Sequence, residues 1–115
     1  MYHIDITEPA EIDMIEAASY IAGQLLNPSA AGRLLDDAET AILSLENMPQ
    51  RHALVNDEDL ARLGIRFIPV NNYLVFYVIR EEKQTVVIQR FLYGKRDWVN
   101  ILKSEINIAP TVREY

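Results

Sequence analysis

Residues 65–98 read IRFIPVNNYLVFYVIREEKQTVVIQRFLYGKRDW, a stretch dense in Val, Ile, Phe and Tyr. These residue types favour strands, and the stretch is divided by two polar turns. Asn71-Asn72 makes the first turn, since Asn tolerates positive φ, and residues 81–84 make the second. The sequence therefore predicts an antiparallel meander of three strands, Ile65–Val70, Tyr73–Arg80 and Thr85–Tyr93.

Counting outward from the turns predicts how the strands pair. Arg66 falls opposite Tyr77, and Arg90 falls opposite Val75. Because side chains alternate between the two faces of a sheet, these four residues share one face. The other face is wholly apolar and carries Leu74, Phe76, Val78, Val87 and Phe91. A second turn of odd length would instead separate the two arginines, because a slip of one residue reverses every side chain.

The rest of the chain predicts helices that cover the apolar face. Thr7 caps a first helix, and Met14, Ala18, Ile21 and Leu25 recur at helical spacing, with Ile12 and Ile15 widening the apolar stripe. Asn27-Pro28 begins a second helix. Its stripe comprises Ala31, Leu34, Leu35, Ala38, Ile42 and Leu45. The short link predicts a helical hairpin, and Tyr2–Ile6 predicts a short edge strand.

Length and composition indicate one domain. We expect a single unit over residues 1–103, with residues 104–115 as a flexible tail or an added edge segment. A short helix should follow Gly94. The chain has no cysteine, and no apolar run reaches the roughly 20 residues that a membrane span needs. A cytoplasmic protein with no membrane contact is the simplest expectation.

The net charge of −6 is unevenly distributed. Residues 1–59 hold 12 Asp or Glu and 2 Arg, whereas residues 60–115 hold 5 Asp or Glu and 9 Lys or Arg. The negative net charge of the whole chain argues against indiscriminate nucleic-acid binding. The excess of Lys and Arg in residues 60–115 is still compatible with a local anion-binding site. The alternative is that the acidic residues are only the solvated faces of two helices.

The candidate site is cationic. Arg66 and Arg90 could stabilise a scissile phosphate bidentately, and Tyr93 could transfer a proton. Flanking phosphates would be held by Arg51, Lys95 and Arg96. Simple alternation places Tyr93 opposite Arg90, so Tyr93 needs a bulge or the turn at Gly94 to join them. We expect no metal and no cofactor, since the chain lacks cysteine, a glycine-rich phosphate loop and a carboxylate–histidine cluster. The alternative is that both arginines pair with the acidic helices or with the carboxylates of a partner protein.

Three stretches together resemble the RelE/ParE superfamily of type II toxin–antitoxin toxins. They are YHIDITEPAEIDMIEAASYI, NPSAAGRLLDDAETAILSLENMP and GIRFIPVNNYLVFYVIREEKQTVVIQRFLYGKRDW, and they span about residues 2–103. The resemblance implies an α+β fold of order β-α-α-β-β-β-α, with a helical hairpin packed on a small antiparallel sheet.

The superfamily has two branches with different targets. RelE-like members cleave mRNA in the ribosome without a metal, and Arg66, Arg90 and Tyr93 match their functional positions. ParE-like members inhibit DNA gyrase and also keep a strand-borne arginine, so Arg66 does not separate the branches. RelE-like toxins tend to be basic and place lysines before the first meander strand, where this chain has Asp57-Glu58-Asp59.

The resemblance predicts a growth-inhibiting toxin. Ribosome-associated mRNA cleavage, with the ribosome and mRNA as partners, is the first expectation. The alternatives are non-enzymatic inhibition of DNA gyrase and an inactive toxin-derived binding module. Either branch implies a cognate antitoxin and a toxin–antitoxin hetero-oligomer. The antitoxin would carry apolar anchors and acidic residues, and would cover the apolar surface left on the arginine face.

Overall fold

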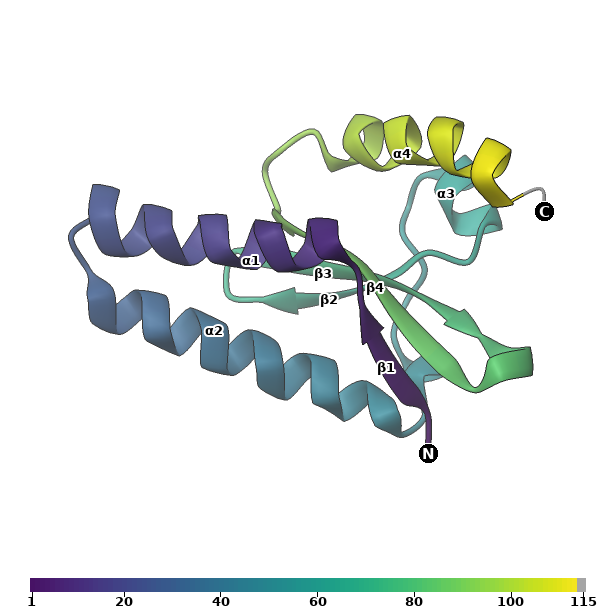
Figure 1. Cartoon of the computed structure of the whole chain (residues 1–115), viewed down its shortest axis with the longest axis horizontal. Coiled ribbons are helices and arrows are strands. Elements are labelled where there is room, and N and C mark those ends of the chain that lie inside the picture. The colour runs from purple at the N-terminus through teal and green to yellow at the C-terminus, as the bar shows by residue number, and fades with distance from the viewer. Residues whose placement is uncertain (114–115) are drawn as a thin grey trace.

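A computed structural model describes the backbone of residues 1–113 and the side chains of residues 1–105. The elements follow the predicted order β-α-α-β-β-β-α, with a short extra helix before the meander. The four-stranded sheet packs against a long helical hairpin through one hydrophobic core and against α3 (Glu58–Arg62) and α4 (Trp98–Arg113) through another. Figure 1 shows α3 and α4 next to each other, away from the tip of the hairpin. The fold is therefore α+β, as the sequence predicts.

The sheet contains the predicted meander and one added edge strand. Strand order is β1-β4-β3-β2, with β1 parallel to β4 and the other neighbours antiparallel. The bounds are β1 (His3–Ile6), β2 (Arg66–Val70), β3 (Tyr73–Arg80) and β4 (Thr85–Tyr93). Asn71 has φ +55°, in the left-handed region that the predicted two-residue turn requires.

A β-bulge in β4 changes the register that the turns predict. Arg80 pairs with Thr85 and Tyr77 with Ile88, as an even-length second turn requires. The next pair along is Phe76 with Arg90, so Gln89 is the extra residue of the bulge. The predicted pairing of Arg90 with Val75 is therefore wrong, because Val75 lies opposite Phe91.

The helical hairpin is capped where the sequence predicts. Helix α1 (Glu8–Ser19) begins after Thr7, and α2 (Pro28–Leu43) begins after Asn27. Each cap side chain accepts a hydrogen bond from the backbone N–H three residues later. Between the helices lies a π-helical turn, η1 (Tyr20–Gln24).

The hairpin packs on the sheet face opposite to the predicted one. Its buried partners on the sheet include Val75, Tyr77 and Ile88. The stripe predicted for the second helix is confirmed at all positions but Leu35, which is half-buried, since Ala31, Leu34, Ala38, Ile42 and Leu45 are buried. The stripe predicted for the first helix is partly wrong. Its buried residues are Ala10, Asp13 and Ala17, whereas Ile12, Ile15 and Leu25 are exposed.

The second sheet face is covered by α3 (Glu58–Arg62) and α4 (Trp98–Arg113). Phe76 and Leu92 are buried there with Leu60 of α3 and Leu102 of α4. The prediction that the arginine face is left uncovered for an antitoxin is therefore wrong, because the chain's own apolar side chains fill both faces. Helix α4 also continues well past Lys103, into the segment predicted to be a tail.

Three short 3₁₀ turns connect these parts. They are η2 (Ser44–Glu46), η3 (Pro49–Arg51) and η4 (Glu81–Lys83). Asp57 caps α3, and Gly64 ends its turn with φ +85°.

Candidate functional site

Arg90 lies at the centre of an internal ion cluster. Its Nε and one terminal nitrogen donate to the two carboxylate oxygens of Asp13 at 2.6 and 2.8 Å. Its other terminal nitrogen donates to Glu105 of α4 at 3.0 Å. The side chains of Arg90 and Asp13 are 16% and 6% exposed. These acids raise the pKa of Arg90, Asp13 foremost by its hydrogen bonds, and the guanidinium therefore joins α1, β4 and α4.

Asp13 also completes the hydrogen bonding of β4. Strand β1 ends at Ile6, which pairs with Ile88, so the later residues of β4 have no neighbouring strand on that side. Helix α1 lies along this edge, and Asp13 accepts the backbone N–H of Phe91 at 3.0 Å. A buried carboxylate thus replaces the missing strand at this point.

Arg66 holds the loop that precedes β2. One of its terminal nitrogens donates to the backbone carbonyls of Gln50 and His52. The neighbouring Tyr77 hydroxyl donates to the Pro49 carbonyl at 2.6 Å, and burial raises the pKa of Tyr77 to about 12. Burial, followed by the nearby charges of Arg51 and Arg66, lowers the pKa of His52.

Arg51 stabilises the C-terminal end of the second helix. Its guanidinium donates to the carbonyls of Ser44, Asn47 and Met48, which end the second helix and its 3₁₀ extension. Positive charge at a helix C-terminus is favourable because the last carbonyls carry partial negative charge. The cation predicted to bind phosphate therefore caps a helix.

The predicted catalytic residues do not come together. Arg66 pairs with Tyr77 and Arg90 with Phe76, and these adjacent β3 residues are buried in the two different cores. The two arginines therefore lie on opposite sheet faces. Tyr93 pairs with Tyr73, four residues along β3 from Tyr77, which separates it from Arg66 by about 13 Å along the sheet.

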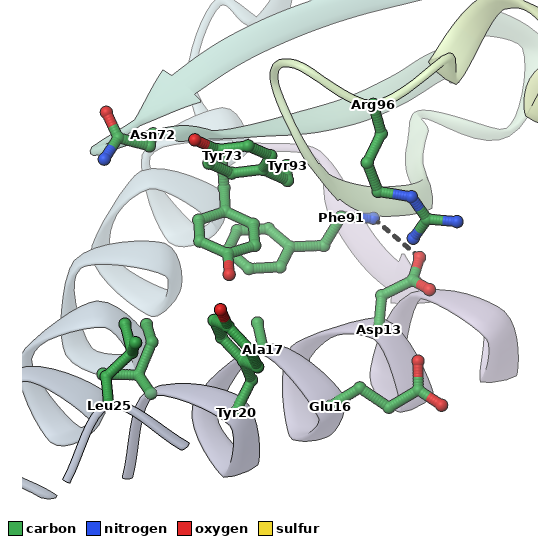
Figure 2. Close-up of a pocket in the computed structure, with 11 residues that line it drawn as sticks. Asp13, Glu16, Ala17, Tyr20, Leu25, Asn72, Tyr73, Phe91, Tyr93 and Arg96 are labelled. Carbon is green, nitrogen blue, oxygen red and sulfur yellow. Dashed lines mark hydrogen bonds between the residues drawn. The ribbon is translucent and has the colours of Figure 1, made fainter. Parts of the chain in front are cut away.

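Tyr93 and Arg96 do lie together, in a cleft between α1 and the end of the sheet (Figure 2). We call this the aromatic cleft; its volume is about 600 Å³. It is lined by Asp13, Glu16, Ala17, Tyr20, Ile21, Leu25, Asn72, Tyr73, Phe91, Tyr93 and Arg96. Lys95 is exposed in the same turn as Arg96 but does not line the cleft.

Aromatic rings form the wall of the cleft on the sheet side. Tyr73 stacks on Phe91 with ring centroids 5.0 Å apart, and Tyr93 meets Tyr73 edge-on at 5.6 Å. Burial raises the pKa of Tyr73, and the nearby phenols of Tyr20 and Tyr93 add to the effect. Three tyrosines therefore gather around one hollow.

The charges of the cleft lie at one end. Asp13 is already bound by Arg90, whereas Glu16 and Arg96 form no ion pair among the described side chains. Figure 2 shows Glu16 and Arg96 on the Asp13 side of the cleft, with Tyr20 and Leu25 farther along α1 and η1.

Sequence reasoning found Tyr93 and Arg96 but missed Tyr20, Tyr73 and Glu16. Tyr73 was available as an apolar residue on the predicted arginine face. Tyr20 gave no such signal, because its position depends on the π-helical turn.

Within the described part of the chain, no three His, Asp or Glu side chains lie close enough to hold a metal ion, and no helix has the length and apolarity to cross a membrane.

Comparisons with known structures give the same fold at low sequence identity. The toxin–antitoxin structure of the chromosomal ParDE system of P. aeruginosa matches with a TM-score of 0.67 and 15% identity, covering 83% of this chain and 98% of that one. The RelBE2 complex of Mycobacterium tuberculosis matches with a TM-score of 0.54 and 24% identity, covering 80% and 90%. The isolated E. coli RelE toxin matches with a TM-score of 0.54 and 16% identity, covering 91% and 97%.

The family comparison covers most of the chain. Residues 4–98 match the model described as "ParE toxin of type II toxin-antitoxin system, parDE". A comparison with curated proteins gives no match. The match extends from β1 through the meander to the first residue of α4, and so includes every strand and both helices of the hairpin. The chain belongs to the ParE toxin family of type II toxin–antitoxin systems.

Proposed function

We propose that this toxin acts by binding DNA gyrase, and that it does not cleave mRNA. The observation that carries the proposal is the commitment of Arg66 and Arg90 to internal contacts on opposite sheet faces. Metal-free phosphodiester cleavage needs cations directed at one developing charge, with a proton donor within hydrogen-bond reach. The membership of the ParE family supports the same choice, because ParE-like toxins are gyrase inhibitors.

The charge distribution also supports a protein target. Helix α1 and η1 expose Glu8, Glu11 and Glu16 and contain no Lys or Arg, while the fourth acid, Asp13, is buried and paired with Arg90. An acidic surface of this kind repels the phosphates of ribosomal RNA and mRNA. The apolar residues exposed beside these acids, Ile12 and Ile15, suit a protein–protein contact.

We further propose that a cognate antitoxin neutralises the toxin as a hetero-oligomer. The ParDE and RelBE2 structures that share the fold are toxin–antitoxin systems. The exposed apolar side chains of the hairpin give such a partner surface to bury. These lie on α1, at the tip of the hairpin and at the end of α2.

Pulse labelling after induction tests the target. We expect DNA synthesis to stop before protein synthesis, and the purified toxin to inhibit supercoiling by purified gyrase. Tyr93→Phe removes the hydroxyl and keeps the ring, so it should leave this inhibition within about twofold of wild type. Tyr20→Phe is the matched control, since it removes a hydroxyl from the opposite wall of the same cleft.

Two outcomes would count against gyrase. An immediate arrest of protein synthesis with cut mRNA, abolished by Tyr93→Phe and not by Tyr20→Phe, would identify a nuclease. Normal growth after induction of soluble, folded toxin would identify an inert binding module.

A further inference from the structure

The aromatic cleft has the composition of a protein-binding hot spot. Tyrosine and arginine are enriched where binding energy concentrates, because they combine a large contact area with a polar group. Here three tyrosines and Arg96 line a hollow of about 600 Å³. That volume accommodates one or two large side chains of a partner.

The tip of the hairpin extends this apolar surface beyond the cleft. Tyr20, Leu25 and Leu26 are 53%, 57% and 83% exposed. Leu26 has φ +53°, which is costly for a side chain with a Cβ, and Tyr20 begins a π-helical turn. Unfavourable backbone of this kind concentrates where a protein binds something.

The charges around the cleft select its occupant. Helix α1 exposes Glu8, Glu11 and Glu16, of which Glu16 lies on the cleft wall, whereas Arg96 is the cation that lines the same end of the cleft. A lysine or arginine placed there would meet a carboxylate and the faces of aromatic rings, both of which attract a cation. An acidic segment would be attracted by Arg96 alone and repelled by the three exposed carboxylates of α1.

We propose that the aromatic cleft is the binding site for one segment of the cognate antitoxin. This segment inserts a large apolar side chain between Tyr20 and Tyr93, and places a lysine or arginine beside Glu16. The identity of the partner as the antitoxin rests on the proposed function. The basic character is the new element, because the resemblance alone predicts acidic residues in the antitoxin.

The test is the affinity of the full-length antitoxin, encoded beside the toxin, for purified toxin variants. Tyr20→Ala/Leu25→Ala should weaken binding by at least about tenfold, since both side chains are anchors of the cleft. Leu43→Ala/Leu63→Ala is the matched control, because Leu43 and Leu63 are 50% and 49% exposed and lie outside the cleft. The control should change the affinity by less than about twofold.

A charge reversal tests the basic flank. Glu16→Lys should weaken binding by at least about tenfold and reduce its dependence on salt, because it turns an attraction into a repulsion. Glu39→Lys makes the same change of charge on the exposed surface of α2 and is the control. Tighter binding by Glu16→Lys would show an acidic segment and overturn the proposal.

Two further outcomes separate this proposal from the proposed function. If Tyr20→Ala/Leu25→Ala binds the antitoxin as tightly as wild type does, the cleft is not the antitoxin-binding site and the proposal is wrong. If the same variant also loses growth inhibition, the cleft binds the toxin's target instead. If wild-type toxin leaves gyrase uninhibited while the cleft variants bind antitoxin more weakly, the gyrase proposal fails and the cleft proposal stands.

Discussion

Arg90 and Asp13 are 77 residues apart in sequence and form a two-pronged ion pair between β4 and α1. Both side chains are largely buried, and Asp13 also accepts the Phe91 N–H. The arginine that sequence analysis assigned to phosphate binding is thus part of the fold's internal framework. This assigns it a measurable role in stability.

Replacing Arg90 with methionine should destabilise the protein by about 3 kcal/mol, because it leaves the Asp13 carboxylate buried without its cation. Urea unfolding followed by circular dichroism measures the change. Arg80→Met is the control, since Arg80 is exposed at the end of β3, and it should stay within about 0.5 kcal/mol of wild type.

The double variant Asp13→Leu/Arg90→Met refines this prediction. Removing both charges should restore most of the stability, with a residual loss of about 1 kcal/mol for the unpaired Phe91 N–H. If Arg90→Met alone is as stable as wild type, the ion pair is not an internal support, and Arg90 is free for another task.

Tyr77 should make stability fall at high pH. Its folded-state pKa of about 12 lies above the roughly 10 of an unfolded chain, so the native state holds the phenolic proton more tightly. The resulting stability is complete below pH 10 and is lost between about pH 10 and 12, at up to about 1.4 kcal/mol per pH unit.

Tyr77→Phe isolates the effect of this single phenol. It should cost about 1–3 kcal/mol at pH 7, since the Pro49 carbonyl loses its donor, and its stability should fall less steeply above pH 10 than that of wild type. Tyr73 titrates in both proteins and therefore cancels from the comparison. Parallel pH profiles would rule out ionisation of Tyr77 as the cause of the lost stability at high pH.

Met48→Gly should stabilise the protein by about 0.5 kcal/mol. Met48 is 72% exposed and has φ +49°, a conformation that costs a residue with a Cβ about 1–2 kcal/mol. Glycine avoids this cost, but it offsets part of the gain because it loses more backbone entropy on folding. Leu43→Gly is the control, because Leu43 has helical φ −65° and glycine there should cost about 1 kcal/mol. Thermal unfolding distinguishes the two, and a lower midpoint for Met48→Gly would contradict the prediction.

Local sequence signals predicted the elements of this fold well. The helix starts at Thr7 and Asn27 are confirmed, and the bounds of the three meander strands agree to within one residue. These features depend on nearest neighbours along the chain, such as a cap side chain and a backbone N–H three residues later. Local chemistry is therefore sufficient to specify them.

Long-range features escaped prediction for identifiable reasons. Both faces of the meander are apolar, so composition did not indicate which one the hairpin covers. The bulge at Gln89 lies within the strand and does not change the length of either turn, so counting from the turns could not reveal it. It nevertheless places Arg90 on the other sheet face. The contacts between Arg90 and α1 and between Arg66 and the loop likewise depend on tertiary placement.

Deleting Gln89 tests the bulge directly. The remaining residues keep their present partners, with Ile88 opposite Tyr77 and Arg90 opposite Phe76, so the deletion variant should fold cooperatively despite losing the Thr7–Gln89 hydrogen bond. Deleting Val87 is the matched control, because it moves Gln89 opposite Tyr77 and turns a polar side chain into the hairpin core. We expect the Val87 deletion to abolish cooperative unfolding in urea. If instead the Gln89 deletion unfolds the protein and the Val87 deletion does not, β4 has no extra residue at this point, and the two arginines regain a common face.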